Sequence, residues 1–381
     1  MKIKILLLAG LGFAVMAPIN AATVDTVPSA PLAWRQASGP RVWNFPRDHG
    51  AHADYRTEWW YFTGNLRTSQ NHRYGYQLTF FRQGIQPSPR NRESAWTVRD
   101  IYPAHFAVTD IGQRQFRFAE QISRAGPGLA GSETGRMKVW CLQWSARMEQ
   151  EKIFLQAGHE GMQLNLALTA RKPLVLHGQR GLSSKGPLAG NATYYYSFTD
   201  LATQGTIATQ QSAVKGSATT VPVTGTSWFD HEFGSNQLSR NHVGWDWFSI
   251  HLTDGRDLML YLLRKRDGSI EGASSGTLVE KSGRSRHLEL ADIGVEILAR
   301  WQSLKSSAPY PARWRLTIPT AGIDLTMATS IADQELKTSG STGIIYYEGA
   351  IDGQGKSAGQ PVSAIGYVEL TGYAGSLGGI I

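Results

Sequence analysis

The sequence predicts an all-β protein whose antiparallel strands close into barrels or stack as sandwiches. Three observations support this class. Apolar and polar residues alternate over short runs, turn-forming residues separate these runs, and the 3.6-residue periodicity of helices is scarce. A doubly wound α/β fold, which needs strands and helices in alternation, is therefore disfavoured.

Individual strands are indicated by this alternation, because successive side chains of a strand point to opposite faces. Within 74–81 and in three later runs, the apolar residues share one face; they are Tyr74, Tyr76, Leu78 and Phe80, then Leu164, Leu166 and Leu168, then Trp314, Leu316 and Ile318, and then Ile323, Leu325 and Met327. Segments rich in Gly, Asp and Ser mark turns at 253–257, 266–269 and 281–285. The segment 93–108 is ambiguous between helix and strand.

The first 21 residues have the pattern of a cleaved signal peptide. Lys2 and Lys4 precede an apolar run at 5–17, and small residues favour cleavage after Ala21. The run is short for a membrane span, and no nearby cysteine offers a site for a lipid anchor. We therefore expect a periplasmic or secreted protein without a stable membrane anchor.

The remaining chain is long enough for two domains. After an N-terminal extension at 22–44, the first domain is expected at 45–225 and the second at 226–381. The segment 202–225 is rich in Thr, Ser, Ala and Gly, which predicts a long loop or hairpin near the junction. A second set of strands begins at Ser227.

Composition and absent motifs exclude several classes of function. The formal charge of +8 falls to about +6 without the signal peptide, and the basic residues are scattered, so we expect no nucleic-acid partner. Cys141 is the one cysteine and has no partner for an intrachain disulfide. The chain has no P-loop, dinucleotide fingerprint or H-E-x-x-H helix, which disfavours NTPases.

The segment 48–62 places acids and histidines beside aromatic rings. In a strand, Glu58 and Trp60 share one face, while Trp59 and Tyr61 share the other. A carboxyl group buried among rings has a raised pKa, as a general acid requires. The alternative is a structural carboxylate bonded to an arginine or to backbone N–H groups.

His49 and His52 have the H-x-x-H spacing that can seat a metal. In a loop containing Gly50, this spacing is more typical of a hydrogen-bonding clasp. We therefore expect no metal and no cofactor, and we place both histidines beside a bound ligand.

Two later segments repeat the combination of acids and rings. Asp230, His231 and Glu232 lie in a row between Phe229 and Phe233, and three adjacent ionisable groups need partners if they are buried. Asp230 is the first candidate for a catalytic acid, and His231 or Glu232 would tune it or orient water. Glu58 and Asp246 are second candidates. The expected pocket walls are Trp59, Trp60, Tyr61, Phe229, Trp245 and Trp247, although tryptophans are more often part of a core.

Five segments together resemble a known family. They are DHGAHADYRTEWWYFTGNL, SWFDHEFGSNQL, GWDWFSIHLTDGRDLMLYLLR, YYEGAIDGQG and GYVELTGYAG. Over nearly the whole mature chain the sequence resembles the secreted proteins related to carotenoid 1,2-hydratase, also called the AttH type. The resemblance implies two lipocalin-like antiparallel β-barrel domains in tandem.

The resemblance implies less about activity. Photosynthetic members of the family hydrate a terminal isoprenoid C=C bond, some relatives are described as secreted hydrolases, and others accompany ABC-type export systems. One hypothesis is a cofactor-free hydratase or hydrolase for a lipophilic, isoprenoid- or lipid-like ligand, with Glu58 and Asp230 facing one pocket. The alternative is a periplasmic carrier of a lipid or hydrophobic metabolite, associated with an ABC-type exporter. A third interpretation is a structural protein whose aromatic residues only pack between the barrels.

Overall fold

The computed structural model describes residues 33–85, 87, 98–210 and 218–378 of the 381-residue chain. The predicted signal peptide and residues 22–32 of the predicted N-terminal extension lie outside the described residues. The described chain is almost entirely β-structure, with three short 3₁₀ helices at η1 (Arg47–His49), η2 (Leu290–Asp292) and η3 (Pro319–Ala321). None of the described helices is long and apolar enough to cross a bilayer.

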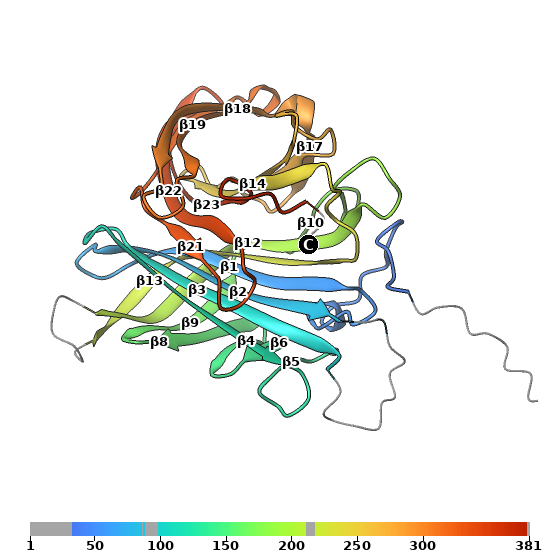
Figure 1. The fold of residues 1–381 in the computed structure, drawn as a ribbon. Helices are drawn as coiled ribbons and strands as arrows, with labels where there is room; N and C mark the ends of the chain where they lie inside the picture. Colours follow the sequence, from blue (N-terminus) through green and yellow to red (C-terminus); the bar gives the residue numbers. More distant parts are fainter. Residues whose placement is uncertain (1–32, 86, 88–97, 211–217, 379–381) are drawn as a thin grey trace, which may run out of the picture. The chain divides into compact units, whose positions relative to one another are not determined.

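The strands form two antiparallel sheets, which confirms the predicted all-β class (Figure 1). The first sheet contains β1 (Thr57–Arg67), β2 (Arg73–Gly84), β3 (Asp100–Asp110), β4 (Gln115–Arg124), β5 (Ala130–Ser132), β6 (Lys138–Cys141), β7 (Trp144–Glu149), β8 (Lys152–His159), β9 (Met162–Ala170), β10 (Val175–Leu176), β11 (Leu182–Ser184), β12 (Ala192–Gln210) and β13 (Ala218–Gly234). Its main order is β4-β3-β2-β1-β13-β12-β9-β8-β7-β6-β5, and the end strands β4 and β5 are in contact, so the sheet curls into a barrel.

The second sheet is formed by the C-terminal part of the chain and is also curled, as Figure 1 shows nearly end-on. It contains β14 (His242–Leu252), β15 (Asp257–Lys265), β16 (Ser275–Val279), β17 (Ser285–Glu289), β18 (Gly294–Gln302), β19 (Pro309–Ile318), β20 (Ile323–Thr329), β21 (Glu335–Lys337), β22 (Ile345–Ser357) and β23 (Gln360–Leu370). Its main order is β17-β16-β15-β14-β23-β22-β20-β19-β18, with β21 paired to β22.

The predicted alternation places the expected apolar faces inside the two barrels. The core of the first barrel contains the predicted faces at 74–80 and 164–168, and the core of the second contains those at 314–318 and 323–327. The segment 202–225 contributes to a hairpin of β12 and β13, one of the two predicted forms. The part of the ambiguous segment at 100–108 lies in strand β3.

The chain passes from one sheet to the other between Gly234 and His242. The predicted boundary at 225/226 therefore falls inside β13, and Asp230, His231 and Glu232 belong to the first sheet. Their assignment to the second domain was wrong, because β13 continues without interruption beyond the polar segment as the partner of both β1 and β12.

Both faces of the first sheet are buried near β1 and β13. On β13, Phe229 belongs to the core of the first barrel, whereas Trp228 belongs to a third apolar cluster. That cluster contains residues from the outer faces of both sheets, Tyr61, Tyr195, Trp228, Trp247, Met259, Tyr261, Leu263, Ala350 and Tyr367, together with Leu238 and Leu377 from segments outside the strands. We call the region between these outer faces the inter-sheet interface.

Candidate functional site

Glu58 lies at the start of β1 and is completely buried inside the first barrel. Its Oε1 accepts hydrogen bonds from His52 Nδ1 at 2.8 Å and from His231 Nε2 at 2.9 Å. Its Oε2 accepts one from Arg82 Nε at 2.9 Å and one from the backbone N–H of His52 at 2.9 Å. We call Glu58, His52, Arg82 and His231 the Glu58 network.

The Glu58 network holds the pKa of Glu58 well below its ordinary value. Burial by itself raises this pKa, but the hydrogen bonds from His231 and His52 and the charge of Arg82 outweigh burial. The prediction that Glu58 has a raised pKa is therefore wrong. The structure instead has the alternative arrangement, a structural carboxylate bonded to an arginine and to a backbone N–H.

The Glu58 network meets one geometric condition for a metal site. Ligand atoms of His52, Glu58 and His231 lie within 4.8 Å of one another. However, both histidines bond to the same carboxylate oxygen, and the Arg82 guanidinium bonds to the other. A cation would have to displace these hydrogen bonds and lie close to a buried positive charge, so the residues do not fit a metal.

Three more of the predicted site residues pack inside the first barrel. Trp60 stacks on the His231 ring at 4.8 Å between centroids, and its Nε1 donates to the backbone oxygen of His49 at 3.2 Å. Phe229 packs in the same core. Burial lowers the pKa of His49 to about 4, and its Nδ1 lies 2.7 Å from the Tyr196 hydroxyl. His49 is therefore a neutral hydrogen-bonding group at neutral pH.

Asp230 lies on the opposite face of the same sheet, in the inter-sheet interface. It is 3% exposed, and it pairs in register with Tyr61 of β1. Its carboxyl accepts hydrogen bonds from Tyr195 OH at 2.7 Å, from Trp228 Nε1 at 2.6 Å and from the Ser197 hydroxyl. The prediction that Asp230 and Glu58 face one cavity is wrong, because the alternation of β1 and β13 sends them to opposite sides.

Asp230 has the raised pKa that was predicted for Glu58. Burial raises the pKa of Asp230 to about 7, and the charge of Glu232 adds to this effect. The three hydrogen bonds lower the pKa but do not cancel burial, because their donors are neutral. The Asp230 carboxyl therefore exchanges a proton close to neutral pH.

Glu232 lies beside Asp230 on the same face of β13 and is paired with a buried lysine. Lys185 Nζ lies 2.8 Å from Glu232 Oε1, and the Thr193 hydroxyl donates to the same carboxyl. Burial lowers the pKa of Lys185, but Glu232 beside it raises the pKa above its ordinary value. Lys185 is therefore a permanent positive charge in the interface.

The second sheet adds two acids that the sequence analysis did not select, Glu348 of β22 and Glu369 of β23. They are direct cross-strand neighbours, so their side chains share one face. Glu348 Oε2 accepts a hydrogen bond from Tyr61 OH at 2.8 Å, and Glu369 Oε2 accepts one from Trp245 Nε1 at 2.7 Å. Tyr61 carries the contact across the interface, since it belongs to the first sheet.

Both of these acids hold protons more tightly than usual. Burial and then the charge of Glu369 raise the pKa of Glu348 well above its ordinary value. Burial and the charges of Asp230 and Glu232 raise the pKa of Glu369 to about 7. We call Asp230, Glu232, Glu348 and Glu369 the carboxyl cluster.

The charge balance of the carboxyl cluster explains this behaviour. Within the described chain, Lys185 is the cation paired to these four acids. One lysine cannot neutralise three buried carboxylates and the partly exposed Glu369, and like charges in a desolvated region favour protonation of some of them. Glu348 Oε1 has no hydrogen-bond partner among the described residues although Glu348 is completely buried. The cluster is therefore a store of exchangeable protons at neutral pH.

Aromatic residues predicted as pocket walls surround the carboxyl cluster. Trp247 Nε1 donates to Tyr195 OH at 3.2 Å, and Trp247 packs edge-on against Tyr61 at 5.1 Å between ring centroids. Trp59 and Trp245 pack against the same apolar cluster and remain partly exposed. Tyr61, Trp59, Trp245 and Trp247 therefore meet at one interface, whereas Trp60 and Phe229 lie in a barrel core.

Asp246 shares its face of β14 with Phe248 and Ile250, and this face points into the second barrel. Burial raises its pKa, and Arg264 Nε donates to its Oδ1 at 3.0 Å. The Tyr373 hydroxyl also donates to this carboxyl. Asp246 therefore lies on the far side of β14 from the carboxyl cluster.

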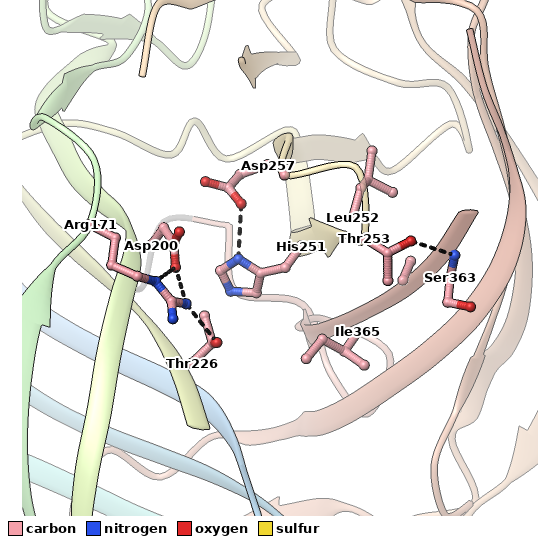
Figure 2. A pocket seen from close by; sticks show the side chains of 11 residues that line it. Arg171, Asp200, Thr226, His251, Leu252, Thr253, Asp257, Ser363 and Ile365 are labelled. Carbon is pink, nitrogen blue, oxygen red and sulfur yellow. Dashed lines mark hydrogen bonds and ion pairs between the residues drawn. The ribbon is translucent and has the colours of Figure 1, made fainter. Parts of the chain in front are cut away.

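A pocket of about 310 Å³ opens at another part of the inter-sheet interface, near His251 (Figure 2). Its walls come from β12, β13 and β23, from the β14–β15 hairpin and from the residue after β9. Another pocket, of about 430 Å³, is lined by residues near Arg67 and Thr224. Neither pocket was predicted from the sequence.

Two curled antiparallel sheets with buried acids and rings between them define an all-β, lipocalin-like protein. The chain belongs to the AttH-like family, whose model matches residues 36–373. A solved structure described as an AttH from Nitrosomonas europaea is 33% identical, with a TM-score of 0.77, and the match covers 91% of this chain and 100% of that chain.

Two more distant structures share the fold. Kievitone hydratase from Nectria haematococca is 16% identical with a TM-score of 0.65, and the match covers 91% of this chain and 98% of that one. CghA is 11% identical with a TM-score of 0.53, covering 84% of this chain and 89% of that one. No curated protein matches this chain.

Proposed function

We propose that this protein is a cofactor-independent hydratase that adds water to a C=C bond of a lipophilic, isoprenoid-like substrate at the inter-sheet interface. The observation that carries the proposal is the carboxyl cluster, in which Asp230 and Glu369 have pKa values of about 7. An acid of this strength both donates and regains a proton at neutral pH, as general acid–base catalysis requires. The fold shared with kievitone hydratase agrees with this class of reaction.

The proposed reaction has two steps. A protonated carboxyl of the cluster gives its proton to one alkene carbon, so that the π electron pair forms the new C–H bond and a carbocation remains on the other carbon. Water then adds to this cation, and the proton that water loses returns to a carboxylate of the cluster. The faces of Trp59, Trp245 and Trp247 stabilise the cation by cation–π attraction.

Asp230 and Glu348 have different roles in this proposal. Both oxygens of Asp230 accept hydrogen bonds from neutral donors, which stabilise the carboxylate left after proton transfer. Glu348 has one oxygen without a partner among the described residues, so it has a free position for bonding water. The partly exposed Trp59, Trp245 and Glu369 mark the end of the interface from which substrate approaches.

Incubation with lipophilic terminal alkenes in H₂¹⁸O tests the proposal. Mass spectrometry should detect a product heavier than the substrate by one labelled water. Asp230→Asn should reduce turnover at least 100-fold, because loss of a general acid typically costs this much. Asp246→Asn is the matched control, since it removes another buried acid of raised pKa that faces away from the cluster, and it should retain turnover.

The same purified protein can be extracted and examined for bound lipid. An intact lipophilic molecule that leaves the interface unchanged, together with no labelled product from any alkene, would contradict the hydratase and favour carriage. In that case, the carboxyl cluster would orient cargo. Export from the cytoplasm is expected for either function, whereas delivery to an ABC-type exporter belongs to the carrier alternative, and dependence of cargo loading on an exporter gene would test that delivery.

A further inference from the structure

The pocket near His251 contains an imidazole that is held from one side and open on the other. His251 Nδ1 lies 3.0 Å from Asp257 Oδ1, and Figure 2 shows this contact on the wall of the pocket. His251 Nε2 has no hydrogen-bond partner among the described residues and is not enclosed by protein atoms. The His251 side chain is 12% exposed to solvent.

Asp257 is itself fixed by residues of the other sheet. Its Oδ2 accepts hydrogen bonds from Lys172 Nζ and from the Thr199 hydroxyl, each at 2.8 Å. The bonds from His251 and Lys172 outweigh burial and lower the pKa of Asp257, so it stays ionised. An ionised carboxylate at Nδ1 fixes the proton on that nitrogen, which leaves Nε2 of the neutral imidazole as an acceptor facing the pocket.

A guanidinium lies on the opposite wall. Arg171 donates to Asp200 through Nε and Nη2, at 2.9 and 2.5 Å, and Nη2 also donates to Thr226 Oγ1 at 2.8 Å. Its Nη1 has no partner within the described chain. The remaining wall is largely apolar and comes from Leu252, Ala364 and Ile365.

The charges of this pocket balance while His251 is neutral. Arg171 is paired with Asp200, and Lys172 is paired with Asp257. The Asp254 and Arg256 side chains on the same hairpin are paired with each other. A bound monoanion would leave one negative charge in excess, and protonation of His251 Nε2 would remove that excess.

We propose that this pocket is a second ligand site, which binds a small monocarboxylic acid with an aliphatic tail. The carboxylate lies between Nε2 of His251 and Nη1 of Arg171, and the tail lies against the apolar wall. Binding takes up one proton from solvent, which forms the Nε2–H bond and breaks no bond in the ligand. The pocket volume is at the lower end of the range of small-molecule sites, which suits such a ligand.

The site is independent of the proposed hydratase reaction, since none of these residues belongs to the carboxyl cluster. A purely structural Asp–His–Lys bridge between the sheets would have no reason to bind an acid or to take up a proton. A ligand site and a structural bridge therefore differ in whether the protein binds an acid and takes up a proton as it does so.

Calorimetric titration of the full protein with octanoate tests the proposal, with octanol as the uncharged probe. Octanoate should bind at least tenfold more tightly than octanol. In the pH range in which binding takes up one proton, octanoate affinity should fall about tenfold per pH unit, and the uptake is measured in buffers of different ionisation enthalpy. Absence of octanoate binding, equal binding of both probes, or binding without proton uptake would each overturn the proposal.

Two variants and a control test whether octanoate binding and proton uptake occur in this pocket. His251→Gln should weaken octanoate binding at least tenfold and abolish the proton uptake, because glutamine cannot titrate. Arg171→Gln, at a half-exposed side chain, should weaken binding while retaining proton uptake. His72→Gln is the control, because His72 also pairs with an aspartate, Asp110, outside the pocket. Loss of binding in this control, or unchanged binding in His251→Gln, would place the ligand elsewhere.

Discussion

Glu58 and Asp230 lie on adjacent strands of one sheet and are both buried, yet burial has opposite outcomes for their acidity. Burial raises the pKa of both carboxyl groups. Glu58 overcomes this because Arg82 and two histidine N–H groups bond to it, whereas the donors to Asp230 are neutral hydroxyl and indole groups. The hydrogen bonds and the charge of the partners together decide whether a buried acid is structural or exchangeable.

The largest expected effect is on the free energy of unfolding, which should distinguish Glu58 from Asp230. Glu58→Gln should lower the free energy of unfolding by about 3–5 kcal/mol at pH 7, because it leaves the buried Arg82 without one of its anionic partners. Asp230→Asn should not lower it and should raise it at pH 7, because asparagine does not ionise and so avoids the cost of a buried carboxylate whose pKa is raised to about 7. Urea unfolding measures both values. Equal losses in the two variants would contradict the comparison.

Removal of Lys185 should have an intermediate effect that depends on pH. Lys185→Met leaves Glu232 without its cation, and we expect a loss of about 2 kcal/mol in unfolding free energy at pH 8. At pH 6 the loss should be smaller, because neighbouring acids with raised pKa then carry protons and repel Glu232 less. Lys138→Met is the control, because Lys138 pairs with Glu133 at a partly exposed site. A loss of unfolding free energy that does not depend on pH would contradict the conclusion that the carboxyl cluster holds exchangeable protons.

The free energy of unfolding should depend on pH with opposite signs for the acids of raised pKa, Asp230 and Glu369, and for Glu58, whose pKa is lowered. Asp230 and Glu369 have folded-state pKa values of about 7, above their unfolded values, so their contribution is greatest below about pH 4 and is lost as pH rises to about 7. Each should contribute a slope of about 1.4 kcal/mol per pH unit in this window. Glu58, with a lowered pKa, contributes stability that is lost only as the solution becomes more acidic than its unfolded value.

Urea unfolding between pH 4.5 and 8 measures these slopes. The Asp230→Asn, Glu369→Gln double variant should have a flatter profile than the wild type over this range. An unchanged profile in the double variant would show that the two acids hold no proton in the folded protein.

The sequence predicted the strands and their alternation well, but it could not assign the faces to inside and outside. The pattern at 57–63 puts Glu58 and Trp60 on one side and Trp59 and Tyr61 on the other, and both sides are rich in rings. Alternation identifies the interior only when the other face meets solvent. Here the outer face is covered by the second sheet, so both faces have the apolar side chains that are typical of a core.

The partners of the acids were harder to predict than the acids themselves. Arg82, Glu348 and Glu369 are each flanked by uncharged residues, without a neighbouring histidine to mark them. Glu348 and Glu369 nevertheless occur in two of the segments that carried the family resemblance, YYEGAIDGQG and GYVELTGYAG. A buried strand position with one carboxyl among aromatic residues was the available signal.

The inter-sheet interface joins the outer faces of two barrels, so neither barrel contains the carboxyl cluster by itself. Asp230 and Glu232 come from one barrel, and Glu348 and Glu369 come from the other. Transplanting one barrel from a relative would therefore carry over half of a site and separate each acid from the residues that set its acidity. Selection on such a site acts on the pair, and the two halves of the chain are expected to change together.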